Sequence, residues 1–163
     1  MQKRLLHVGC GGDAKPEWAT EYTETRLDID GSHNPHIVAS MTDMGDIGEY
    51  DAIYCSHALE HLTPEDGDKA LAEFVRVLAP GGFAMVLVPD LEDVKATDEV
   101  ILEAPCGPIT GLDMIYGLRG LPYMAHQTGF VKSTLDKTMH RAGFAKVATN
   151  RLSNYNLIGI GVK

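Results

Sequence analysis

A short apolar run that ends in glycines sets the strongest limit on how this chain can fold. Residues 5–12 read Leu-Leu-His-Val-Gly-Cys-Gly-Gly, which predicts a buried strand and then a tight turn. Glycine lacks a Cβ, so it can adopt a positive φ and lets a ligand approach the main chain. The pattern alone is also typical of a plain turn, so it indicates a ligand site only in combination with other features of the chain.

Strand-like and helix-like segments alternate after this turn, which predicts an α/β fold with a mainly parallel sheet. The clearest helix covers residues 64–78, with Thr63 as N-cap and Pro80-Gly81-Gly82 as its end. A second helix is expected over residues 134–142, with Gly143 as C-cap. The expected strands are residues 4–8, 26–30, 36–39, 51–55, 83–88, 145–150 and 157–162, the last two as an antiparallel pair.

The pattern loosens between residues 89 and 131. Residues 91–102 are compatible with a helix, whereas residues 104–123 contain many glycines and prolines and predict an irregular excursion. With 163 residues in all, the chain is expected to form one domain over residues 1–163.

Composition excludes several classes of protein. The net charge of −9, without a Lys/Arg cluster, disfavours nucleic acid as a partner. No apolar run reaches the roughly 20 residues of a membrane span, and no signal-peptide pattern opens the chain, so we expect a cytoplasmic protein. Three cysteines without CxxC spacing predict no disulfide.

Three polar features are predicted to meet at one edge of the sheet. They are the glycine turn, a carboxylate at the end of the second strand (Asp28 or Asp30), and the Ser56-His57 pair after the fourth strand. Ligands bind beyond the carboxyl ends of parallel strands, where an acidic residue can accept hydrogen bonds from a ribose diol. The glycines do not form G-x-G-x-x-G, and Asp13 would repel a phosphate. A nucleoside cofactor without phosphate therefore fits best.

Four segments resemble successive motifs of class I S-adenosylmethionine-dependent methyltransferases: LLHVGCGG, RLDID, YDAIYCSHALEHL and FVRVLAPGGFAMVLVPD. The pattern HQTGF…L…AGF in residues 126–144 is similar to a group of small bacterial methyltransferases of type 11. The resemblance implies a Rossmann-like three-layer sandwich with a seven-stranded, mostly parallel sheet and an antiparallel last strand. It also implies methyl transfer from S-adenosyl-L-methionine to an oxygen or nitrogen of a small-molecule acceptor, with residues 89–131 on the acceptor side.

The resemblance assigns cofactor contacts to residues near the ends of the first strands. Gly9, Cys10 and Gly11 would pass under the methionine part. Asp28 would hold the ribose hydroxyls, and Ile29 would face the adenine. The full set is His7, Gly9, Cys10, Gly11, Asp28, Ile29, Ser40, Met41 and Ser56.

Three positions depart from the family pattern. An acidic residue is usual where His7 stands, a third glycine where Asp13 stands, and an adenine-binding carboxylate where Ser40 stands. These departures motivate an alternative, namely a non-catalytic module that binds the cofactor or a nucleoside. If the chain is an enzyme, His57 or His126 is the candidate catalytic base, because histidine titrates near neutral pH. Tyr116 and Tyr123 either line the acceptor space or pack the loop.

A competing motif overlaps the fourth strand's end. Residues 57–61 spell H-x-x-E-H, the pattern of inverted zinc proteases. A five-residue match arises easily by chance, and no later helix offers an obvious third ligand, so the sequence predicts no metal. The expected partner is a small-molecule acceptor, with no membrane, and the chain is expected to be a monomer or a homodimer.

Overall fold

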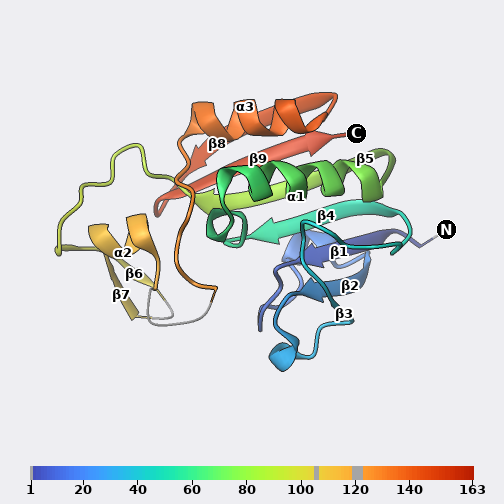
Figure 1. Cartoon of the computed structure of the whole chain (residues 1–163), viewed down its shortest axis with the longest axis horizontal. Coiled ribbons are helices and arrows are strands. Elements are labelled where there is room, and N and C mark those ends of the chain that lie inside the picture. The colour runs from blue at the N-terminus through green and yellow to red at the C-terminus, as the bar shows by residue number, and fades with distance from the viewer. Residues whose placement is uncertain (1, 105–106, 119–122) are drawn as a thin grey trace.

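The computed structural model describes residues 2–104, 107–118 and 123–163, and its centre is a seven-stranded sheet (Figure 1). The strand order is β3-β2-β1-β4-β5-β9-β8. Strands β1 to β5 are parallel, whereas β9 runs antiparallel to β5 and β8. This confirms the predicted Rossmann-like sheet with a reversed last strand. The strands are β1 (Arg4–Val8), β2 (Thr23–Asp28), β3 (Ile37–Val38), β4 (Tyr50–Ser56), β5 (Leu78–Pro89), β8 (Lys146–Leu152) and β9 (Asn156–Val162).

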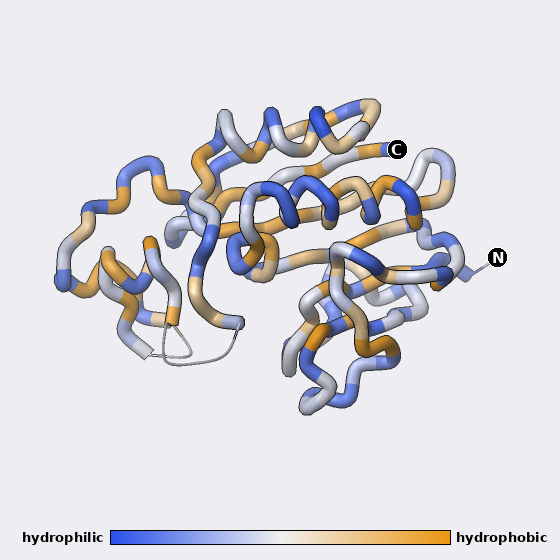
Figure 2. The backbone as a smooth tube through the Cα atoms, viewed as in Figure 1, coloured by the Kyte–Doolittle hydropathy of each residue, from blue (hydrophilic) through white to orange (hydrophobic). Residues whose placement is uncertain are grey.

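Two helices, α1 (Pro64–Val77) and α3 (Lys132–Ala142), cover one face of this sheet (Figure 1). The Thr63 hydroxyl accepts a hydrogen bond from the Asp66 N–H and caps α1 as predicted. Gly143 ends α3 with a φ of +103°, which glycine adopts without strain. In Figure 2, hydrophobic segments run along β5 and β9, while α1 alternates in hydropathy. Both helices therefore press an apolar stripe onto the main core.

The opposite face carries a much thinner layer. Strand side chains alternate between faces, so Leu6 packs in the main core while Leu5 belongs to a separate small cluster. The short helix η1 (Glu17–Ala19) brings the Trp18 ring to 6.2 Å from Tyr54 and 5.6 Å from Phe83. The segment between β1 and β2 forms no long crossover helix, as predicted, and η1 with Trp18 covers this face instead.

The segment between β5 and α3 differs from the prediction. Residues 91–102 do not form a helix. Instead β6 (Val100–Ala104) pairs antiparallel with β7 (Gly107–Thr110), and α2 (Gly111–Tyr116) comes next. The expected irregular stretch 104–123 is thus wrong for residues 107–116, because β7 pairs with β6 and a capping box between Thr110 and Asp113 starts α2. Residues 105–106 and 119–122, including Cys106, lie outside the described residues.

Two further short helices, η2 (Gly31–His33) and η3 (Leu59–His61), stand at the carboxyl ends of β2 and β4. They frame a cleft at this edge of the sheet.

Cys10 and Cys55 are free thiols, and burial raises the pKa of each, so both stay protonated at neutral pH. Across the described ranges, no helix is long and apolar enough to cross a membrane.

Candidate functional site

A cleft of about 250 Å³ opens at the carboxyl ends of β1, β2 and β4. It lies at the edge where the three polar features are predicted to meet. Seven of the predicted site residues line it: Gly9, Gly11, Asp28, Ile29, Ser40, Met41 and His57. The structure adds lining residues to which the sequence analysis assigns no contact: Leu27, His33, Ala39, Ala58, His61, Leu62, Met124 and Gln127. Asp30 and Tyr123, both candidates from the sequence, also belong to the lining.

The glycine turn is shaped by a close approach of two chain segments. Gly9 has a φ of +61°, and a Cβ placed on it would lie only 2.5 Å from the Ala58 Cβ. Its N–H donates to the Leu27 carbonyl at 2.9 Å, which ties the turn to β2. Gly11 also has a positive φ, but no atom of the described residues lies within 4 Å of a Cβ built there. Gly9 is therefore required by packing, and Gly11 faces open space.

Asp28 holds the glycine turn as well as facing the cleft. Its Oδ2 accepts the Gly11 N–H at 2.7 Å, and its Oδ1 accepts the Asp30 N–H at 2.9 Å. A carboxylate has about four lone-pair positions, so each oxygen can still accept a ligand hydroxyl. This geometry suits a ribose diol, because the two oxygens are already fixed by the backbone.

The neighbouring wall is apolar. Ile29 is 51% exposed although its residue type favours burial. Met41, Leu27 and Ala39 continue this surface. The Ser40 and Thr42 hydroxyl oxygens lie 2.8 Å apart, so the Ser40 side chain already has a protein partner. The wall can pack against a flat ring such as adenine.

Three predicted cofactor contacts, His7, Cys10 and Ser56, are not among the lining residues that the structure describes. His7 is 1% exposed. Its Nδ1 lies 2.8 Å from Glu24 Oε1, and its ring packs against Tyr54 at 5.1 Å. The His7 side chain is therefore held by contacts inside the protein and is not part of the cleft wall. Cys10 is part of the turn, but it is fully buried.

His57 comes directly after β4 with a φ of +50°, an unusual conformation for a non-glycine residue. Its ring is half-exposed on the cleft wall, and Nδ1 lies 3.5 Å from Glu60 Oε1. The Glu60 carboxylate raises the pKa of His57 above its usual value. The second candidate base, His126, has its pKa lowered by burial, and it does not appear in the cleft lining of the described residues.

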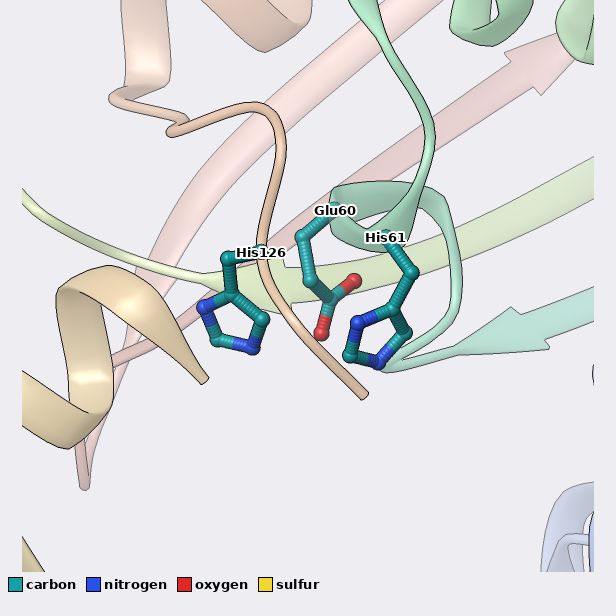
Figure 3. Close-up of side chains that lie close together, drawn as sticks. All are labelled: Glu60, His61 and His126. Atoms are coloured by element: carbon teal, nitrogen blue, oxygen red, sulfur yellow. The ribbon is translucent and has the colours of Figure 1, made fainter. Parts of the chain in front are cut away.

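A segment far along the chain closes this part of the cleft. The N–H groups of Gln127 and Thr128 donate to the Glu60 carbonyl at 2.9 and 3.1 Å. The Thr128 hydroxyl donates to the Leu62 carbonyl at 2.7 Å. These bonds carry His126 to η3, where its ring centre lies 5.1 Å from that of His61 (Figure 3). The sequence shows the H-x-x-E-H motif of residues 57–61 and the motif that begins at His126, but nothing in the spacing between them indicates that they lie side by side.

A mostly parallel sheet with a cleft at the carboxyl ends of its strands, a glycine turn and a carboxylate facing that cleft is the arrangement expected of an S-adenosylmethionine-dependent methyltransferase. Residues 6–86 match the family described as "Methyltransferase domain". Through this half of its length the chain belongs to that family, which confirms the class predicted from the sequence. None of the curated proteins matches this sequence.

Solved structures show the same fold at low sequence identity. An S-adenosylmethionine-dependent methyltransferase from Mesorhizobium loti is 17% identical, with a TM-score of 0.68 over 99% of this chain and 91% of that one. An O-methyltransferase family protein from Burkholderia thailandensis is 12% identical, with a TM-score of 0.67 over 99% and 51%. A 1,6-didemethyltoxoflavin-N1-methyltransferase from the same organism, solved with S-adenosylhomocysteine, is 12% identical, with a TM-score of 0.65 over 99% and 71%. The chain spans about half the length of several of its structural neighbours.

Proposed function

We propose that the cleft binds S-adenosylmethionine and that the chain transfers its methyl group to an oxygen or nitrogen of a small acceptor. The observation that carries this proposal is the convergence of the Gly9–Gly11 turn, the Asp28 carboxylate and the exposed Ile29 on one cleft. In the bound state, Asp28 would accept the ribose hydroxyls and Ile29 would pack on the adenine. Structural neighbours that hold S-adenosylhomocysteine support the choice of cofactor.

The reaction needs alignment more than activation, since the sulfonium is already a good leaving group. The acceptor atom attacks the methyl carbon, the S–CH₃ bond breaks, and S-adenosylhomocysteine leaves. The acceptor's proton passes to a base, for which His57 and His126 are the candidates. Holding the two reactants in line and excluding water supplies most of the rate enhancement.

The acceptor would enter beside residues 123–127. The opposite side of the cleft is the cofactor wall, which consists of the Gly9–Gly11 turn, Asp28 and Ile29. Tyr123, Met124 and Gln127 line this side of the cleft and offer both apolar and polar contacts. The net charge of −9 favours a small acceptor over nucleic acid. One structural neighbour is a 1,6-didemethyltoxoflavin-N1-methyltransferase solved with 1,6-didemethyltoxoflavin bound, which supports a small-molecule acceptor here. We further propose one domain over residues 1–163, working in the cytoplasm as a monomer or homodimer.

Titration calorimetry of the full chain with S-adenosylmethionine and S-adenosylhomocysteine tests the proposal. One cofactor molecule is expected to bind per chain. Incubation with methyl-labelled S-adenosylmethionine and a panel of small hydroxyl and amine compounds then tests transfer. Replacement of His57 by glutamine should lower turnover far more than cofactor affinity. If neither nucleoside binds, the proposal is wrong.

A further inference from the structure

Glu60 is the most unusual polar group among the described residues. The residue is 1% exposed, and neither carboxylate oxygen has a hydrogen-bond partner. The nearest cationic candidate is His57, whose Nδ1 is 3.5 Å from Oε1 and thus beyond a normal hydrogen bond. A buried carboxylate that accepts no hydrogen bond is costly, and the half-exposed His57 ring at 3.5 Å offsets only part of the lost hydration. The site therefore favours a bound cation.

Two imidazole rings flank this carboxylate. His61 and His126 each offer a ring nitrogen, and these atoms and a Glu60 oxygen lie within 4.8 Å of one another. Figure 3 shows the carboxylate between the two rings, with His126 arriving on a separate segment. Two histidines and one carboxylate are a common ligand set for divalent transition metals.

The tautomer of His126 suits a ligand. Its Nδ1 donates to the Met114 carbonyl at 3.0 Å, which leaves the lone pair on Nε2. Metal-binding histidines generally use the second nitrogen in this way, because the hydrogen bond to a carbonyl fixes the ring's orientation. The backbone N–H groups of Gln127 and Thr128 donate to the Glu60 carbonyl and lock the two ligand segments together. The cluster is thus held in place from both sides.

We infer that Glu60, His61 and His126 bind one divalent transition-metal ion at the border of the cleft. This departs from the expectation of no metal, which rests on the absence of a third ligand. His61 also lines the cleft, so a fourth coordination position can be open to a molecule bound there. Three protein ligands and one open position are typical of catalytic rather than structural zinc sites.

The role of this ion in methyl transfer rests on the proposed function. An acceptor with a hydroxyl group would place its oxygen on the metal, which lowers the pKa of a bound hydroxyl and orients it toward the methyl group. Oxygen acceptors are then favoured over nitrogen acceptors, and His126 is a ligand rather than a base. The metal site itself depends only on the three side chains and not on methyl transfer.

The test is calorimetry of the full chain, first stripped with a chelator, with Zn²⁺ as probe and Mg²⁺ in parallel. We expect one Zn²⁺ per chain and much weaker Mg²⁺ binding, because imidazole prefers the softer ion. Glu60→Gln keeps the shape of the side chain and should weaken Zn²⁺ binding about 100-fold or more, since even outer-shell changes cost about 10- to 100-fold. His140→Gln, on the exposed side of α3, is the matched control and should bind as the native chain does.

Thermal unfolding distinguishes a loss of Zn²⁺ binding from a loss of folding. Zn²⁺ should raise the melting temperature of the native chain and of the His140 variant but not of the Glu60 variant, because only ligand binding to the folded state stabilises it. Absence of Zn²⁺ binding to the folded native chain, or equal affinity in Glu60→Gln, would overturn the assignment, as would a preference for Mg²⁺. S-adenosylhomocysteine binding, measured in the same samples, separates this failure from a failure of the proposed function.

Discussion

The two walls of the cleft are built in different ways. The cofactor wall grows directly from the ends of β1 and β2, and Asp28 fixes its glycine turn through the Gly11 N–H. The acceptor wall belongs to residues 123–128, which come from a distant part of the chain and attach to η3 by a few hydrogen bonds. Under the proposed function, cofactor binding depends on the sheet itself, whereas acceptor recognition depends on a segment attached to η3.

The first test concerns the packing of the cofactor wall. Gly9→Ala should lower the free energy of unfolding by about 2–5 kcal/mol, of which about 1–2 come from the positive φ and about 1–3 from the overlap with Ala58. Gly11→Ala has the same backbone cost but no overlap, so a loss of only about 1–2 kcal/mol is expected. Urea denaturation measures both. Equal losses would show that the contact with Ala58 does not determine the turn.

The second test concerns the ligand-facing charge of the same wall. Asp28→Asn should weaken S-adenosylhomocysteine binding about 10- to 100-fold, because hydrogen bonds to a charged group contribute about 1.5–3 kcal/mol. Asp30→Asn, two residues further on, tests the other candidate carboxylate that lines the cleft. Its carboxylate accepts the Ser32 N–H in a local turn, so a change below about threefold is expected. Similar effects from both variants would argue against the ribose role of Asp28.

The third test addresses the acceptor wall alone. Thr128→Val removes the hydroxyl that donates to the Leu62 carbonyl, at a cost of about 1 kcal/mol for one hydrogen bond. Amide hydrogen exchange at residues 125–128 should become faster, while the affinity for S-adenosylhomocysteine stays within about twofold. Faster exchange throughout β1 and β2 would contradict the separation of the two walls.

The sequence indicates one wall far better than the other, for a physical reason. Thr63, Pro64 and Gly143 mark helix ends by local chemistry, and α1 and α3 form accordingly. Likewise, the end of a parallel strand determines where Asp28 and His57 emerge. The helix expected over residues 91–102 is wrong: residues 91–99 form a loop, and residues 100–102 belong to β6, whose pairing with β7 no local pattern reveals.

The site shows the same limit at the level of single residues. His7 lies on β1, two residues before the glycine turn of the predicted site, yet its ring contacts Glu24 and Tyr54 instead of the cleft. His126 meets Glu60 only because residues 125–128 fold back onto η3. Contacts between segments so far apart depend on tertiary packing, so motif spacing alone could not predict them.

If the glycine turn, Asp28 and Ile29 form one adenosyl-binding cleft, the native chain must bind an adenosyl compound there. Calorimetric titration of the native chain with S-adenosylhomocysteine, beside the Asp28→Asn variant, tests this most directly. We expect one binding site per chain in the native protein and clearly weaker binding in the variant. Absence of binding to the folded native chain, or equal affinity in both proteins, would contradict the assignment of the cleft.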